Sequence, residues 1–183
     1  LEQHTVPGGF TQSFRRGGWA WDVGLHVVGE MGTRGMFGRV LDALSDERLK
    51  WKKIDGAYDV AELPDGREIE IAGSLSGLRA NLLRAFPNEA KAIDTYFTRM
   101  REASAAMRDY FVARSLTPWL QRTAPGPTRD LALARTADVL DGLTRDPSLR
   151  AVLAVHWVFY GTPPAESNFG THALLARHYR QGG

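Results

Sequence analysis

Apolar residues recur at helical spacing from Ser74 onward. One stripe follows Ser74 and stops before Pro87, and a longer stripe covers about residues 88–115 with charged residues on the opposite face. Because positions three and four apart share one face of a helix, this spacing predicts two amphipathic helices, with Ser74 capping the first. The stripes comprise Leu75, Leu78, Leu82 and Phe86, and then Ile93, Tyr96, Phe97, Met100, Ala103, Met107, Tyr110 and Phe111.

Two proline-containing dipeptides mark further helices near the C-terminal end. Asp146-Pro147 predicts a helix start, because aspartate accepts hydrogen bonds from free backbone N–H groups and proline tolerates the first helical position. We expect that helix to run to about Trp157, and Pro163-Pro164 to stop the pattern. A last helix is expected over residues 167–180. One side of it carries Phe169, His172, Ala176 and Tyr179.

The N-terminal part alternates instead, with a period of two. Residues 11–27 have the pattern of a β-hairpin, with Gly17-Gly18 as a two-residue turn. Successive strand residues point to opposite faces, so the larger apolar side chains of the second strand share one face, which we expect to join the core. These are Trp19, Trp21, Val23 and Leu25, whereas Ala20, Asp22, Gly24 and His26 form a small and polar face.

Shorter patterns connect the hairpin to the long helices. Residues 34–44 have helical spacing and predict a short amphipathic helix. Residues 49–54, 58–63 and 67–71 are predicted strands, and Pro64-Asp65-Gly66 joins the last two through a turn. This part therefore predicts a small antiparallel sheet.

The composition is that of a folded protein without a strong charge bias. The 183 residues with 43% hydrophobic content suffice for one core, or for one domain and part of another. The 23 basic residues are scattered against 21 acidic ones, so no nucleic-acid-binding patch is predicted. Cysteine is absent, which excludes disulfides and a cysteine nucleophile and suits a reducing, cytoplasmic location. No signal peptide is predicted, and the longest apolar stretch, residues 151–160, is far below the ~20 residues that cross a bilayer.

Two features before the hairpin fit a dinucleotide site. Glu2 follows an apolar residue, and a carboxylate at a strand end can accept hydrogen bonds from both ribose hydroxyls of an adenosine. Gly8 and Gly9 would let the backbone approach a flat or anionic ligand, since glycine has no obstructing side chain. Each feature has a plainer alternative, a solvated glutamate for the first and a tight turn after Pro7 for the second.

The polar face of the second hairpin strand is a more specific candidate. The gap at Gly24, between Asp22 and His26, could form a bed for a planar ring. His26 could transfer a proton near neutral pH, although the sequence supplies no orienting partner. The alternative is that Asp22 caps a turn and that His26 is a hydrogen-bonded core histidine.

The remaining histidines do not predict a metal site. They are His4, His156, His172 and His178, and their spacing matches no metal-binding motif. His172 shares a helix face with Phe169 and Tyr179, which favours a hydrogen-bonded core histidine. No nucleophile elbow or phosphate-binding loop is present, so the sequence assigns no catalytic residue.

Three N-terminal segments resemble one family when they are taken together. They are Leu1-Glu2-Gln3-His4, then Pro7-Gly8-Gly9, then Trp21-Asp22-Val23-Gly24-Leu25-His26-Val27-Val28-Gly29. Their order and spacing are similar to those of the FAD-dependent family of phytoene desaturases, carotenoid cis-trans isomerases and retinol saturase. Residues 146–153, 160–164 and 167–183 also look like the later helical region of this family, so the resemblance spans nearly the whole chain.

The resemblance implies a fold between α/β and α+β. Residues 1–48 would form part of a Rossmann-type FAD-binding domain. Residues 49–165 would form a substrate domain of antiparallel sheet and helices. Residues 166–183 would form a helix that returns to the FAD domain.

The resemblance also implies FAD as the cofactor and assigns its contacts. Glu2 would hold the adenosine ribose, and Gly8 and Gly9 would lie along the cofactor. The face of Asp22, Gly24 and His26 would lie near the flavin.

The implied reaction is desaturation, saturation or isomerisation of a polyene isoprenoid of carotenoid or retinoid type, by flavin hydride chemistry. The implied partner is this apolar, lipid-like substrate, with peripheral contact to a membrane and no nucleic acid. Because the chain starts within the motif, the sequence predicts a fragment that would not hold FAD tightly alone. The alternatives are a non-catalytic lipid- or isoprenoid-binding module and a decayed copy of the enzyme.

Overall fold

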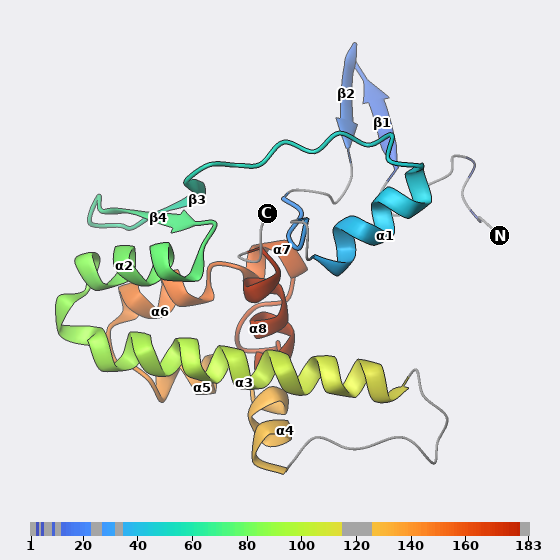
Figure 1. Ribbon diagram of the computed structural model, residues 1–183. Coiled ribbons are helices and arrows are strands. Elements are labelled where there is room, and N and C mark those ends of the chain that lie inside the picture. The colour runs from blue at the N-terminus through green and yellow to red at the C-terminus, as the bar shows by residue number, and fades with distance from the viewer. Residues whose placement is uncertain are drawn as a thin grey trace.

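The computed structural model describes residues 3, 5, 9, 12–22, 27–31, 35–114 and 126–179. These ranges form a mainly helical body with two separate antiparallel sheets of two strands each (Figure 1). The strands are β1 (Ser13–Arg16), β2 (Trp19–Asp22), β3 (Ala57–Glu62) and β4 (Glu68–Ala72). The helices are α1 (Met36–Ser45), α2 (Leu75–Ala85), α3 (Ala90–Arg114), α4 (Gly126–Leu133), α5 (Thr136–Asp141), α6 (Pro147–Ala154), α7 (Trp157–Tyr160) and α8 (Phe169–His178), with a 3₁₀ turn η2 (Pro87–Glu89) before α3.

Helices α2 and α3 confirm the two longest predicted stripes. Ser74 caps α2, and its hydroxyl accepts a hydrogen bond from the Gly77 N–H over 3.1 Å. The stripe of α3 is buried as far as Ala106. Beyond that point α3 extends past the body, so Tyr110 and Phe111 are 53% and 52% exposed although the pattern placed them on the same stripe.

Helix α8 confirms the predicted last helix and lies at the centre of the body (Figure 1). Asn168 caps it by accepting a hydrogen bond from the Thr171 N–H over 2.8 Å. Every member of the predicted stripe is buried, namely Phe169, His172, Ala176 and Tyr179. The helical period therefore identified the face that meets α3.

Helix α6 begins as predicted but ends early. The Asp146 carboxylate accepts hydrogen bonds from the N–H groups of Ser148 and Leu149 over 2.8 and 3.0 Å. The helix stops at Ala154 instead of continuing to about Trp157, and the short helix α7 follows. His156 lies in the turn between these two helices and is 1% exposed.

The sheet of β3 and β4 confirms two of the three predicted strands. The turn between them is closed by the Gly66 N–H, which donates to the Leu63 carbonyl oxygen over 2.9 Å. Residues 49–54 were predicted as a third strand, and that prediction is wrong. They are exposed and form no strand, because no neighbouring edge among the described residues pairs with them.

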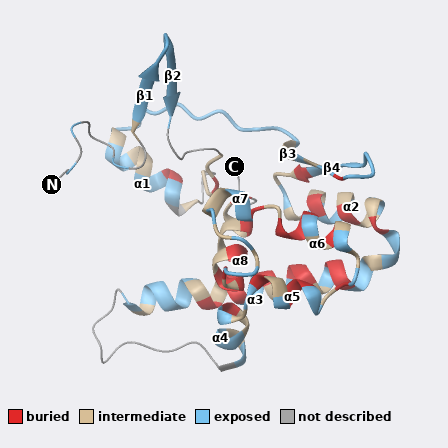
Figure 2. Ribbon diagram, turned by 180° about the vertical axis from the view of Figure 1, so that it is seen from behind, coloured by how far each residue is buried: buried red, intermediate tan, exposed pale blue. Residues whose placement is uncertain are grey.

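The N-terminal hairpin forms with the predicted turn, but its predicted core face is wrong. Arg16 pairs with Trp19, and Gly17 and Gly18 have φ values of +57° and +82°, as a two-residue turn requires. Trp19 and Trp21 are nevertheless 71% and 53% exposed. The hairpin rises beside α1 and stands away from the helices that carry the buried core, so this face has no core within the described chain to join (Figure 2).

The hydrophobic core lies entirely in the helical body and its sheet. Every buried apolar side chain among the described residues falls between Leu63 and Tyr179. In Figure 2 most of the buried stretches lie on the helices of this body. The predicted fold class is confirmed in part. Helices pack over an antiparallel sheet, as predicted for residues 49–165. Both sheets among the described residues are antiparallel, so neither is the parallel sheet of a Rossmann domain. Within the described ranges, every helix is too short or too polar to span a bilayer.

Candidate functional site

The predicted cofactor-binding residues fall only partly within the described structure. Glu2, Gly8, Gly24 and His26 lie outside the described residues. Gly9 is exposed, with a φ of +53° that glycine adopts without strain, and its carbonyl accepts a hydrogen bond from the Gln12 N–H over 3.4 Å. Asp22 ends β2 opposite Ser13 and is exposed. Gly9 and Asp22 are therefore both accessible to a ligand.

The segment that follows the hairpin, residues 27–31, lies against the C-terminal end of α8. The Gly29 N–H donates a hydrogen bond to Nε2 of His178 over 3.1 Å. Gly29 is buried so tightly that a Cβ at this position would lie 1.8 Å from the His178 carbonyl oxygen. Only glycine fits there. We call this contact between Gly29 and His178 the α8 joint.

The same segment also holds the start of α1. Glu30 has a φ of +58°, which is uncommon outside glycine, and its carbonyl oxygen accepts a hydrogen bond from the Gly38 N–H over 3.1 Å. A Cβ at Gly35 would lie 1.8 Å from that same oxygen. From α1, the Phe37 ring meets the His178 ring edge-on at 6.0 Å between centroids. The exit of the hairpin, α1 and α8 therefore meet at one place.

Burial shifts the pKa values of basic groups near the α8 joint. It lowers the pKa of His178 below its usual 6.5, while the negative charge of Glu30 acts in the opposite direction. Burial also lowers the pKa of Arg177, the positive charge of Arg108 adds to this effect, and Glu30 again opposes it. A neutral His178 ring can accept the hydrogen bond from Gly29, whereas the protonated ring has only donors.

A second polar group lies inside the core around His172. The Tyr96 hydroxyl is 3.0 Å from His172 Nε2 and donates to the Leu153 carbonyl oxygen over 3.3 Å. The Tyr160 hydroxyl is 3.3 Å from His172 Nδ1. Burial raises the pKa of Tyr160, although hydrogen bonds with Ser167 and Thr136 oppose the shift. These contacts join α3, α6, α7 and α8.

His156 extends this buried group toward the sheet. Its Nε2 is 2.6 Å from the Tyr58 hydroxyl of β3. Its ring stacks on Tyr179, with centroids 6.1 Å apart and planes 23° from parallel. Its centroid also lies 6.2 Å from that of His172. We call His156, His172, Tyr58, Tyr96, Tyr160 and Tyr179 the core network.

The two histidines and Tyr96 of the core network are closed to solvent and hold the body together, whereas Tyr58 and Tyr160 are half-buried. His156 and Tyr96 are each 1% exposed, and His172 is 0% exposed. Buried polar groups that bond one another fix a single packing arrangement. The prediction that His172 is a hydrogen-bonded core histidine is confirmed, and the structure assigns no catalytic role to any member.

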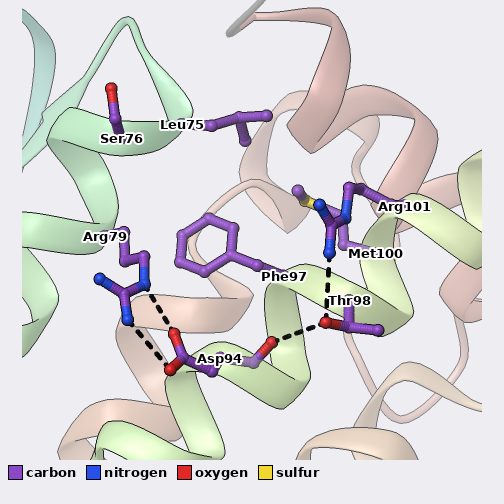
Figure 3. Close-up of a pocket in the computed structure, with 8 residues that line it drawn as sticks. All are labelled: Leu75, Ser76, Arg79, Asp94, Phe97, Thr98, Met100 and Arg101. Atoms are coloured by element: carbon purple, nitrogen blue, oxygen red, sulfur yellow. Dashed lines mark hydrogen bonds and ion pairs between the residues drawn. The ribbon is translucent and has the colours of Figure 1, made fainter.

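A cleft of about 310 Å³ opens between α2 and α3 (Figure 3). At its rim, the Arg79 guanidinium holds the Asp94 carboxylate through two hydrogen bonds of 2.6 and 3.0 Å. These hydrogen bonds lower the pKa of Asp94 and raise that of Arg79. The two charges neutralise each other, and Phe97 in the wall is only 9% exposed. The cleft is therefore part of the packing interface between two helices, and we assign no ligand to it.

The sequence did not predict the α8 joint or the pairing of Tyr58 with His156. Gly29 lies in the motif that carried the resemblance, but its partner His178 is 149 positions away. Tyr58 and His156 are 98 positions apart. Local periodicity carries no information on pairs so distant in the chain. The one local signal was the recurrence of glycine at positions 29, 35 and 38, because closely spaced glycines mark close backbone approach.

The chain is similar over its whole length to proteins named all-trans-retinol 13,14-reductase. It is 31% identical to the one from Danio rerio and 32% identical to the one from Homo sapiens. A further relative from Danio rerio, 25% identical, carries the name inactive all-trans-retinol 13,14-reductase. Each alignment covers 100% of this chain and 32% of the relative, so the chain spans about a third of the length of these proteins. No family model matches the chain.

Proposed function

We propose that this chain, which is homologous over its full length to the all-trans-retinol 13,14-reductases, forms part of an FAD-dependent oxidoreductase or isomerase of retinoids or related isoprenoids. The observation that carries the proposal is the alignment itself, which includes every residue of the chain at 31% and 32% identity. A shared reaction remains a proposal, because the alignment covers 32% of each relative.

In this proposal the N-terminal residues meet the cofactor. Glu2 would accept hydrogen bonds from the adenosine ribose, Gly8 and Gly9 would lie along FAD, and Asp22, Gly24 and His26 would face the flavin. The exposure of Gly9 and Asp22 fits this role, because a residue that contacts a ligand cannot be committed to the protein core. Bound FAD would supply hydride transfer, and the protein would supply orientation and exclusion of water.

The domain division follows the same logic. Residues 1–48 would belong to a Rossmann-type FAD domain, residues 49–165 to the substrate side, and residues 166–183 to a return toward the FAD domain. The apolar core formed by the sheet and helices supports placing residues 49–165 on the substrate side. The α8 joint connects residues 27–31 with α8 and so supports the return of residues 166–183 toward the FAD domain. The substrate would be an apolar polyene, reached from the cytoplasm or at a membrane surface.

A chimera tests this function. The matching third of the Danio rerio all-trans-retinol 13,14-reductase is replaced by this chain, and the purified product is assayed for flavin absorbance and for 13,14-reduction of all-trans-retinol. We expect bound flavin and measurable turnover. Gly24→Val should lower the flavin content, whereas Gly73→Ala should preserve it, since a Cβ at Gly73 would meet its nearest neighbour at an ordinary 3.5 Å. A folded chimera without flavin would contradict the proposal.

A second candidate is a non-catalytic member that binds a retinoid or lipid without converting it. The relative that is named inactive favours this candidate, because it too aligns with the whole chain. The same chimera separates the two candidates. A folded chimera that binds flavin and retinol but converts neither retinol nor any polyene of a carotenoid panel would identify the non-catalytic role.

A further inference from the structure

We propose that Gly29 and His178 form a pH-sensitive latch, which fastens the exit of the N-terminal hairpin to the end of α8 near neutral pH and releases it in mild acid. This inference goes beyond the proposed function and requires no bound flavin. Its test measures the protection of backbone amides and not flavin binding or turnover. A negative result for the latch therefore leaves the proposed function intact, and loss of the proposed function leaves the latch intact.

The direction of the hydrogen bond makes the latch depend on protonation. The backbone N–H of Gly29 can only donate, so Nε2 of His178 must accept with its lone pair over the observed 3.1 Å. A proton on Nε2 turns this nitrogen into a donor. Two donors would then face each other at hydrogen-bond distance, and the bond would be lost.

The close fit around Gly29 means that the segment cannot adjust while it stays in place. The backbone of residue 29 is buried against the last turn of α8, with room for no side chain. We therefore expect the segment 27–31 to move away from α8 as the two donors separate. Because Glu30 and Gly38 share a hydrogen bond, the start of α1 is expected to move with it.

Charged and aromatic groups from several elements lie near His178. Glu30, from segment 27–31, is an acidic group that acts on it, and it favours the protonated ring. From α1, the uncharged Phe37 ring faces it. On α8 itself, Arg177 precedes it, and the positive charges of Arg101 and Arg108 on α3 act on that arginine.

The last neighbour is Tyr179, whose ring lies 5.6 Å from that of His178 and 5.8 Å from that of Tyr58 in β3. Burial raises the pKa of this tyrosine, so it stays neutral across the range in which histidine titrates. Glu30 and the carbonyl end of α8 both favour a cation at His178, and burial outweighs them. Tyr179 therefore does not titrate together with His178 in this range.

The sign of the pH dependence follows from the lowered pKa of His178. The fastened state binds a proton less readily than the released state, whose histidine titrates near the usual 6.5. The stabilisation is thus fully present above about pH 6.5 and is lost as the pH falls through the range between the two pKa values. Within that range the ratio of fastened to released molecules decreases by up to about tenfold for each pH unit.

Amide hydrogen exchange of the full chain, followed by NMR and corrected for intrinsic rates, measures this release. We expect the protection factors of the Gly29 and Gly38 amides to fall several-fold between about pH 7.5 and pH 5.5. Amides in the middle of α3, such as that of Met100, should keep theirs, because that segment belongs to the body. Equal protection of Gly29 at both pH values, or a parallel loss in α3, would overturn the latch.

Two variants keep the test decisive. His178→Gln retains a side-chain acceptor that does not titrate, so Gly29 should stay protected at both pH values, and an unchanged pH dependence would overturn the proposal. Gly29→Ala places a Cβ against the His178 carbonyl and should abolish protection of Gly38 at both pH values. Gly142→Ala is the matched control, since its Cβ would meet neighbours at 3.4 and 3.6 Å and should change nothing.

Discussion

Two regions of this chain carry equally clear apolar patterns, but only one of them buries its pattern. In the helical body, residues 57–179, Ile93 and Met100 on the stripe of α3 are both 0% exposed. In the N-terminal region, residues 12–54, Trp19 and Leu44 are 71% and 78% exposed. An apolar pattern therefore shows which face of an element must pack against other residues, but it does not show whether those residues lie in the same stretch of chain.

The proposed function explains why apolar side chains of the N-terminal region are exposed. Among its described residues, the N-terminal region exposes the large apolar side chains of Phe14, Trp19, Trp21, Phe37, Val40, Leu44, Leu49, Trp51 and Ile54. The curated relatives are about three times as long as this chain. In a protein of that length, we expect further parts of the fold to cover this surface.

The largest expected effect comes from removing an aromatic ring from each region. Phe169→Ala should lower the free energy of unfolding by about 3–5 kcal/mol, because the ring is completely buried and its loss leaves a cavity. Trp21→Ala, its matched counterpart in the hairpin, should change the free energy of unfolding by less than about 0.5 kcal/mol, because the ring packs on no core.

Urea unfolding followed by circular dichroism measures both variants. If the two substitutions were equally destabilising, the hairpin would share the stability of the body, and the comparison between the regions would be wrong.

A smaller effect is expected inside the core network. Tyr96→Phe removes the hydroxyl that contacts His172 Nε2 and the Leu153 carbonyl, and should cost about 1–3 kcal/mol because buried polar atoms lose a partner. Tyr110→Phe on the exposed part of the same helix is the control and should be close to neutral. Thermal melts of both proteins test this, and equal melting temperatures would show that the network adds no stability.

The smallest of these effects is expected at a helix cap. Asp146→Ala removes the acceptor for the N–H groups of Ser148 and Leu149 and should lower the free energy of unfolding by about 1 kcal/mol. Asp55→Ala, in the exposed segment before β3, is the control and should have no effect. The prediction fails if the two variants unfold at the same urea concentration.

Local sequence features predicted the parts of the fold that depend on local physics. The caps at Ser74, Asp146 and Asn168 act within three residues, and two of the three were the predicted starts of their helices. The glycine turn of the hairpin is equally local. The predicted strand at residues 49–54 was wrong because a strand needs a partner edge, which alternation alone cannot supply.

From the sequence alone, candidate cofactor contacts could be predicted only within the N-terminal motif. The core position of His172 followed from its place on a helical face, and it is confirmed. The partner of Gly29 could not be found from the sequence, because the contact spans 149 positions and depends on how α8 packs. The cofactor roles of Glu2, Gly8, Gly9, Asp22, Gly24 and His26 stay predictions.

Hydrogen exchange resolved along the whole chain at neutral pH tests most directly whether the two regions differ in stability. We expect amides in the buried part of α3 and in α8 to exchange only by global unfolding, and those of β1 and β2 to exchange orders of magnitude faster, as in an isolated two-stranded hairpin. Equal protection of the hairpin and α8 would contradict this expectation, because the N-terminal region would then have the same stability as the body.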